Sequence, residues 1–218
     1  MGRAEERRLQ ILERIAAASK VARRDPGEVT LVAVSKTRTA DEIEELIATG
    51  QHDFGESRVQ EALAKWPGIL ARHSDVRLHC IGRLQSNKAT DAVRLFDSIH
   101  SVDRRSLLDA LVKEAEKAER SPSIYVQVNI GDEPQKGGCS IGEIPSLVDA
   151  VRQSSLPLAG LMCIPPLDLE PSPFFALLAK VARQHGVLGL SMGMSADYPV
   201  AVMLGATAVR VGTALFEG

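Results

Sequence analysis

Eight short apolar runs alternate with amphipathic helical patterns along this 218-residue chain, and this alternation limits the fold more than any other feature. Continuous apolar strands separated by helices imply a parallel sheet whose outer face those helices cover. Eight such units favour a closed (β/α)8 barrel, with an open doubly wound sheet as the alternative. The expected strands lie at about 29–36, 52–55, 77–82, 98–102, 124–130, 158–164, 188–193 and 208–212.

The helical patterns between these runs carry apolar stripes and recognisable start and stop signals. A first helix precedes the first strand, with apolar residues at helical spacing over 9–22, and Asp25-Pro26-Gly27 ends it. Thr39 and Glu42 form a capping-box pattern for the next helix. The clearest apolar stripe lies over 107–118. No helix is expected after the last strand.

Length and composition agree with a single domain that spans residues 1–218. With 44% apolar residues the chain can bury one large core. It contains no linker, no internal repeat and no low-complexity tract. These features together predict an α/β protein, a single (β/α)8 TIM barrel with an extra N-terminal helix.

Charge and cysteine content exclude several classes of function. A net charge of −2 gives no basic field for nucleic acid, and no apolar run approaches the ~20 residues that span a bilayer. The charged segment 1–8 is not a signal peptide. The three cysteines are widely spaced, as suits free thiols in a reducing cytoplasm, and no metal-binding motif occurs. We therefore expect a cytoplasmic, monomeric protein that binds neither nucleic acid nor a membrane.

A lysine follows the first apolar run, and its position points to chemistry. Residues 31–37 read as a buried strand that ends in a positive charge at Lys36. A buried ammonium is costly unless it is paired, deprotonated or covalently used. In a barrel, the carboxyl end of a strand lies at the mouth where such folds place their active sites. Lys36 is therefore a candidate nucleophile.

The last two strands supply the features of a phosphate site at the same end of the barrel. Alternation along 208–212 directs Arg210 inward if its two valine neighbours face the helices. Gly212 and Thr213 follow, and the loop 191–195 is small, bears hydroxyl groups and precedes a helix. Barrels often bind phosphate with the loops after strands seven and eight. A ligand that carries an aldehyde for Lys36 and a phosphate for the loops after strands seven and eight matches both features. Pyridoxal phosphate is the obvious candidate.

Each of these residues also has a purely structural interpretation. A strand-end lysine usually extends into solvent, and Arg210 lies on the surface if the strand register shifts by one residue. Met162 and Met192 read more simply as core residues, His79 as a hydrogen-bonded core histidine, and Asp103 as a helix N-cap. Only the occurrence of several such features at one predicted end of one barrel favours a binding site.

With these residues, from the strand that ends at Lys36 to the motif around Arg210, the sequence resembles the pyridoxal phosphate homeostasis protein family over essentially its whole length. The lysine strand and the motif around Arg210 are its most specific parts. The matching stretches are 32–37, 54–56 with 58–61, 81–82 with 84–88, 128–130 with 136, 160–162, 190–195 with 197, and 209–216.

The resemblance implies a barrel like the N-terminal domain of alanine racemase, with pyridoxal phosphate held as a Schiff base on Lys36. It also implies phosphate contacts at Ser191, Gly212 and Thr213, and a pyridine ring near Arg210. We also predict that Met162, Met192 and Ser57 contact the cofactor. Ser57 stands where the family usually has asparagine, which shortens or removes a polar contact near the cofactor.

Two functions remain in competition, a carrier that holds and delivers the cofactor to apoenzymes and a racemase that uses it. Racemisation needs an acid or base on each face of the substrate carbon, and Lys36 serves only one. In enzymes like alanine racemase a tyrosine from a second domain serves the other, and we expect this chain to lack that domain. Tyr125 lies too early on its strand, and Tyr198 reads as a helix-start residue.

A permanently charged Arg210 would also keep the pyridine nitrogen unprotonated and weaken the ring as an electron sink. We therefore expect a carrier without evident turnover, with an amino-acid racemase as the alternative. A lysine aldolase acting on a sugar phosphate is a third possibility. It would need carboxylates around the lysine, and Glu56 is the only clear candidate.

Overall fold

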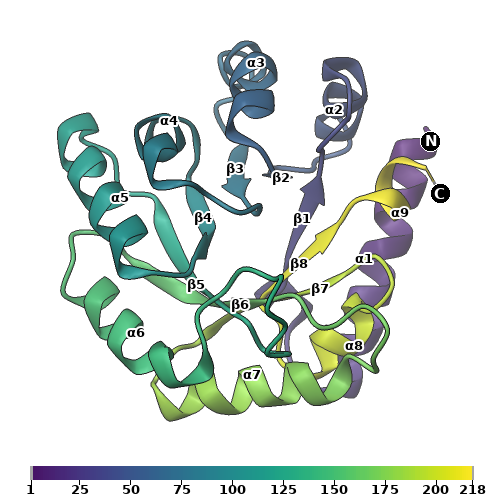
Figure 1. Cartoon of the computed structure of the whole chain (residues 1–218). Helices are drawn as coiled ribbons and strands as arrows, with labels where there is room; N and C mark the ends of the chain where they lie inside the picture. The colour runs from purple at the N-terminus through teal and green to yellow at the C-terminus, as the bar shows by residue number, and fades with distance from the viewer. Residues whose placement is uncertain (1, 218) are drawn as a thin grey trace.

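The structure is a computed structural model that describes residues 2–217, and its centre is a closed barrel of eight parallel strands (Figure 1). Each strand pairs with its neighbours in chain order, and β8 pairs with β1 to close the ring. The closed barrel is therefore confirmed over the open sheet. The strands are β1 (Thr30–Val34), β2 (Asp53–Glu56), β3 (Arg77–Cys80), β4 (Ser98–Val102), β5 (Ser123–Val128), β6 (Leu158–Cys163), β7 (Gly189–Met194) and β8 (Ala208–Val211).

A helix follows every strand and covers the outside of the barrel. Three 3₁₀ turns, η1 (Pro26–Glu28), η2 (Ser86–Lys88) and η3 (Ile141–Glu143), precede β1, α4 and α6. Within residues 2–217 every helix is too short or too polar to span a bilayer. The helices are α1 (Arg3–Val21), α2 (Ala40–Ile47), α3 (Val59–Leu70), α4 (Ala89–Leu95), α5 (Arg105–Ala118), α6 (Ile144–Arg152), α7 (Ser172–Gln184), α8 (Tyr198–Met203) and α9 (Thr213–Phe216).

The helix α1 packs into the outer ring of helices beside α8 and α9. The expectation of no helix after the last strand is wrong, because α9 is present, but α9 has only four residues. Figure 1 shows α1 beside α8 and α9, where a full eighth helix would lie. Arg7 Nε donates to Leu215 O at 2.7 Å, and Arg8 Nη2 donates to Gly50 O at 2.8 Å. The two arginines tie α1 to α9 and to the end of α2.

Local sequence signals explain several helix boundaries. At the start of α2, Thr39 Oγ1 accepts from the Glu42 backbone N–H, and the Glu42 carboxylate accepts from the Thr39 N–H, which confirms the capping box. The N-cap expected at Asp103 is wrong, because Arg104 occupies that position of α5. The Asp103 carboxylate pairs with Arg104 and accepts from the Gly138 backbone N–H.

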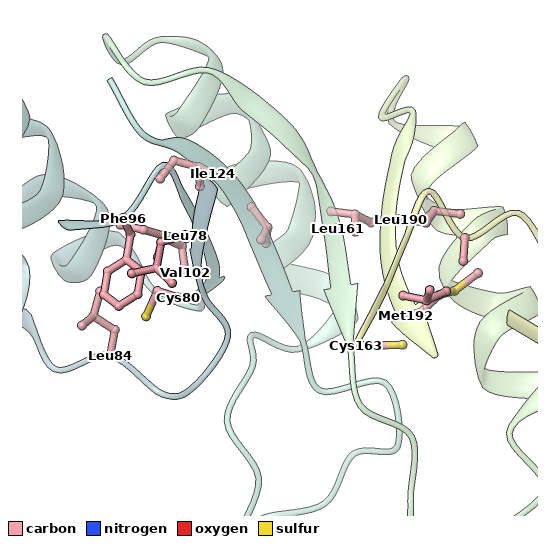
Figure 2. Close-up of a cluster of buried hydrophobic side chains, with 14 of the residues drawn as sticks. Leu78, Cys80, Leu84, Phe96, Val102, Ile124, Leu161, Cys163, Leu190 and Met192 are labelled. Atoms are coloured by element: carbon pink, nitrogen blue, oxygen red, sulfur yellow. The ribbon is translucent and has the colours of Figure 1, made fainter. Parts of the chain in front are cut away.

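The apolar core lies mainly between the strands and the helices. Figure 2 shows part of it, where Leu161, Leu190 and Met192 pack on the helix-facing side of the strands. Val209 and Val211 belong to the same cluster, which confirms the predicted register of β8. Cys80, Cys139 and Cys163 are buried and free, and burial raises the pKa of each thiol to about 12.

The barrel interior, in contrast, is largely polar. Buried polar side chains from six strands project into it, and Met162 lies between them. These polar residues are Asp53, His79, His100, Gln127, Ser191 and Arg210.

Behind the end of β1 lies a buried ion pair, which we name the Glu56–Lys65 clamp. Glu56 is wholly buried, and its Oε1 accepts from Ser35 Oγ and Trp66 Nε1, both at 2.8 Å. Lys65 Nζ lies 2.7 Å from the same oxygen. Lys65 also donates to the backbone carbonyls of Ser35 at 2.8 Å and Arg38 at 3.3 Å. The clamp therefore holds the backbone on both sides of residues 36 and 37.

If α1 completes the barrel, truncation of its buried face will destabilise the whole fold. Ile15 is 2% exposed and Leu9 is 39% exposed on the same helix. Ile15→Ala should lower the free energy of unfolding by about 2–5 kcal/mol because it leaves a cavity. Leu9→Ala should change it by less than about 0.5 kcal/mol. Denaturant titration measures both, and equal effects would show that α1 packs only loosely.

Removal of one partner from the Glu56–Lys65 clamp should also be costly. Lys65→Met keeps most of the side-chain volume but leaves the Glu56 carboxylate buried without its cation. Breaking a buried pair in this way costs about 3–5 kcal/mol. Lys117→Met, in an exposed pair with Glu114, is the matched control and should leave stability nearly unchanged. A small loss for Lys65→Met in thermal and denaturant unfolding would contradict the clamp.

Candidate functional site

A cleft of about 330 Å³ opens at the carboxyl ends of β1, β7 and β8. Barrel folds place their binding sites at this end, and the volume lies within the usual range for small-molecule pockets. The loop after β7 and the first residues of α9 form much of its wall. The lining residues are Val34, Lys36, Thr37, Arg38, Met194, Ser195, Ala196, Arg210, Gly212 and Thr213.

Lys36 lies at the mouth as predicted, but it is not buried in a strand. The strand β1 ends at Val34, and Lys36 occupies a turn in which the Arg38 N–H donates to Ser35 O at 3.0 Å. Thr37 in this turn has a φ of 65°, in the left-handed region. Lys36 is exposed on the cleft wall, so the argument from a costly buried ammonium is wrong. Its backbone is nevertheless held by the Glu56–Lys65 clamp.

Arg210 forms the floor of the cleft. It is 4% exposed and points inward, as the alternation along β8 predicts. Its Nη1 donates to Ser191 Oγ at 2.6 Å, and its Nη2 donates to Cys163 O at 2.9 Å. In the part of the chain that the structure describes, no carboxylate lies within ion-pair distance of this guanidinium. Burial lowers the pKa of Arg210, but an arginine keeps its charge in proteins, so a cation faces the cleft.

Gly212 and Thr213 stand at the edge of this cleft beside the loop after β7. A Cβ at Gly212 would lie 3.3 Å from Val34 Cβ, so the residue permits a close approach of two strands. The Gly212 backbone N–H donates to Ser195 Oγ at 3.3 Å. Thr213 is exposed at the rim. These groups place hydroxyls and a backbone N–H around one small volume.

Ser191 lies below the cleft rather than on its wall. Its side chain is fully buried, and its Oγ is 2.8 Å from His100 Nδ1 in addition to the bond from Arg210. The serine of the same loop that lines the cleft is Ser195. A register shift causes the difference, because Ser191 pairs with Ala208 whereas Met194 pairs with Arg210.

The bulge in β7 depends on a glycine. Gly193 has a φ of 92°, and a Cβ there would lie 2.6 Å from Ala201 Cβ on α8. The extra residue changes the alternation of side chains, so that Met194 and Ser195 reach the cleft. The sequence contains this glycine, but nothing in it marks the register shift.

The other three predicted site residues do not line the cleft. Met192 packs in the helix-facing core, which agrees with its simpler interpretation as a core residue. Met162 is fully buried in the interior, where it pairs in register with Ser191. Ser57 is half-buried after β2, and Gly82 packs directly on its backbone. Contacts of these residues with a cofactor stay predictions.

Positive charges and hydroxyl groups line the cleft beside apolar side chains. Lys36, Arg38 and Arg210 contribute three cations. Arg38 pairs with Glu217 and Glu42, which raises its pKa, and its guanidinium lies 5.1 Å from the centre of the Phe216 ring. These contacts fasten α9 to the loop after β1. The cleft is therefore suited to an anionic ligand that also offers a group reactive toward an amine.

The carboxylate and tyrosines needed for the competing functions lie elsewhere. Glu56 is turned away from Lys36 into the clamp, so the aldolase hypothesis loses its one candidate carboxylate. Tyr125 stacks on His100 with 4.2 Å between ring centroids and lines a separate cavity of about 200 Å³. Tyr198 is buried at the start of α8. Neither tyrosine lines the cleft.

Comparison with known proteins places the chain among relatives of this architecture. The family model for the N-terminal domain of alanine racemase matches residues 10–218. The pyridoxal phosphate homeostasis protein of Pseudomonas aeruginosa is 40% identical over 215 residues, which cover 95% of this chain and 92% of that protein. The Escherichia coli (strain K12) protein of the same name is 37% identical over 227 residues, with 95% and 93% covered.

Solved structures give the same result. PipY of Synechococcus elongatus PCC7942 with pyridoxal phosphate bound superposes with a TM-score of 0.81 at 40% identity, covering 94% of this chain and 99% of that one. An alanine racemase of Clostridium difficile has a TM-score of 0.67 at 12% identity over 94% of this chain and 55% of its own, so this likeness shows the fold alone. On the family model and the curated relatives together, the chain belongs to the pyridoxal phosphate homeostasis protein family.

Proposed function

We propose that this protein binds pyridoxal 5'-phosphate as a Schiff base on Lys36 and takes part in its intracellular homeostasis and delivery. One observation carries the proposal. An accessible amine, a buried unpaired guanidinium and a set of hydroxyls all face the same cleft. The relative PipY, 40% identical, has been solved with this cofactor bound.

The residues around the cleft divide the recognition of the ligand between them. Lys36 Nζ attacks the aldehyde carbon, and the carbonyl oxygen leaves as water when the C=N bond forms. Gly212 and Thr213 bind the phosphate through a backbone N–H and a hydroxyl, as predicted from the sequence. Ser195 supplies the further hydroxyl that we expected from Ser191. Arg210 lies beside the pyridine ring and leaves its nitrogen unprotonated.

The openness of the site supports delivery rather than protected catalysis. Lys36 and Thr213 are both exposed, so water and other proteins can reach the linkage and the phosphate. Enzymes that stabilise carbanions exclude water from the reacting atoms. We therefore favour transfer of the cofactor to apoenzymes in the cytoplasm.

The alternative function is an amino-acid racemase, because the matching family model is that of the N-terminal domain of alanine racemase. It requires a second acid or base opposite Lys36. Tyr125 and Tyr198 both lie away from the cleft. This geometry favours a carrier without evident turnover.

Borohydride trapping tests the position of the linkage. The protein should be yellow with the cofactor, bleach on reduction and carry the adduct on the peptide that contains Lys36. Lys36→Ala should bind at least ~10-fold more weakly, equivalent to about 1.4 kcal/mol, because the covalent bond is lost. Lys88→Ala and Lys136→Ala are matched controls and should bind normally. An adduct on Lys88 or Lys136 would refute the assignment.

Proton exchange tests the carrier against the racemase. Holo-protein is incubated with each L-amino acid in deuterated water, and α-proton exchange and chiral inversion are followed. Since positioned proton transfer contributes ~10²–10⁴-fold, the lack of a second group should leave only slow exchange. Free cofactor and an authentic alanine racemase provide the two reference rates. Inversion at about 1 s⁻¹ or faster, within the enzymatic range, would favour the racemase.

A further inference from the structure

A chain of buried hydrogen bonds runs through the barrel from Arg210 to Asp53. Arg210 Nη1 donates to Ser191 Oγ at 2.6 Å, and Ser191 Oγ lies 2.8 Å from His100 Nδ1. His100 Nε2 lies 3.0 Å from His79 Nδ1, and His79 Nε2 lies 2.9 Å from Asp53 Oδ1. The five residues come from β8, β7, β4, β3 and β2. Nothing in the proposed binding reaction uses the three on β2, β3 and β4.

With both histidines neutral, only one arrangement of protons satisfies every contact in this chain. The ionised Asp53 can only accept, so His79 carries its proton on Nε2 and accepts at Nδ1. His100 must then carry its proton on Nε2 and donate it to His79. Its Nδ1 is left as an acceptor, so the Ser191 hydroxyl donates to His100 and accepts from Arg210. Every bond points from the cation to the carboxylate.

The surroundings support this direction. Burial, reinforced by the nearby charge of Arg210, holds the pKa of His100 well below its ordinary value. The Tyr125 ring stacks on His100 and restrains its plane. At the far end Arg77 Nη2 donates to the second oxygen of Asp53 at 2.8 Å. Hydrogen bonds that point one way between opposite charges strengthen one another.

We propose that His100 is a positioning residue for Arg210, with its tautomer set by His79 and Asp53. The inference rests on the proposed function, because Arg210 is taken to lie beside the pyridine ring. Arg210 has only neutral acceptors, Ser191 Oγ and Cys163 O, to orient its guanidinium. Because the Ser191 hydroxyl donates its hydrogen to His100 Nδ1, a lone pair of Ser191 Oγ faces Arg210 Nη1. Without that acceptor, the hydroxyl hydrogen has no partner among the described residues, and the bond from Arg210 Nη1 to Ser191 Oγ weakens, which leaves Cys163 O as the main acceptor that orients Arg210.

The first test reads the histidine tautomers in the protein without cofactor. Side-chain ¹⁵N NMR at about pH 8, above the ordinary histidine pKa of ~6.5, should find the proton on Nε2 of both His79 and His100. In Asp53→Asn, Arg77 turns the amide oxygen toward itself, the amide nitrogen then donates to His79, and both tautomers should reverse. Tyr125→Phe keeps the stacked ring and should change neither. A proton on Nδ1 of wild-type His100, or a charged His100, would overturn the proposal.

The second test measures the effect on the bound cofactor. His100→Asn keeps a polar atom near the position of Nδ1, beside Ser191, and should bind like the wild type. His100→Gln keeps one near the position of Nε2, beside His79, and should bind about tenfold more weakly with a shifted absorption band. Equal affinity and spectra for the two variants would overturn the positioning role.

Asp53→Asn provides the same test if the glutamine variant fails to fold. Its reversed chain also deprives the Ser191 hydroxyl of its acceptor, so affinity should fall about tenfold in the wild-type background. When Asp53→Asn is made in the His100→Asn background, affinity should not fall further. A further fall in this double variant would contradict the proposed chain of hydrogen bonds. A wild-type protein with the expected tautomers but no cofactor binding would refute the proposed function and leave the proton arrangement standing.

Discussion

The pairing of β8 with β1 is the contact on which the site depends. In this register Val32 lies beside Arg210 and Ala33 beside Val211, so residues almost two hundred positions apart in sequence share one edge of one cleft. Only the intervening chain joins these two strands covalently. The free energy of closing the barrel, supplied by the core between strands and helices, is therefore also what brings Lys36 to the loops after β7 and β8 that line the same cleft.

Much of this arrangement could be predicted because it depends on local patterns. Continuous apolar runs gave the strands to within a few residues, and the inward direction of Arg210 followed from the two valines beside it. The capping box at Thr39 was readable because both partners lie within four residues. The position of Lys36, Gly212 and Thr213 at one end of the barrel followed from the order of the strands.

The features that could not be predicted from the sequence depend on contacts between distant segments. The bulge in β7 leaves Ser191 below the cleft and brings Ser195 to its wall, and strict alternation cannot reveal it. The exposure of Lys36 follows from an early end of β1, where Lys65 from α3 takes the carbonyls that a longer strand would use. The prediction of His79 as a hydrogen-bonded core histidine is confirmed, but its partners could not be predicted, because His100 and Asp53 lie on neighbouring strands that are distant in sequence.

The bond from Arg7 to Leu215 has a consequence for the connectivity of the chain. It places the start of α1 next to α9, so the first and last described helices are neighbours in space. A circular permutant that joins these two ends and opens an exposed turn on the opposite face would retain the same sequence of neighbouring strands.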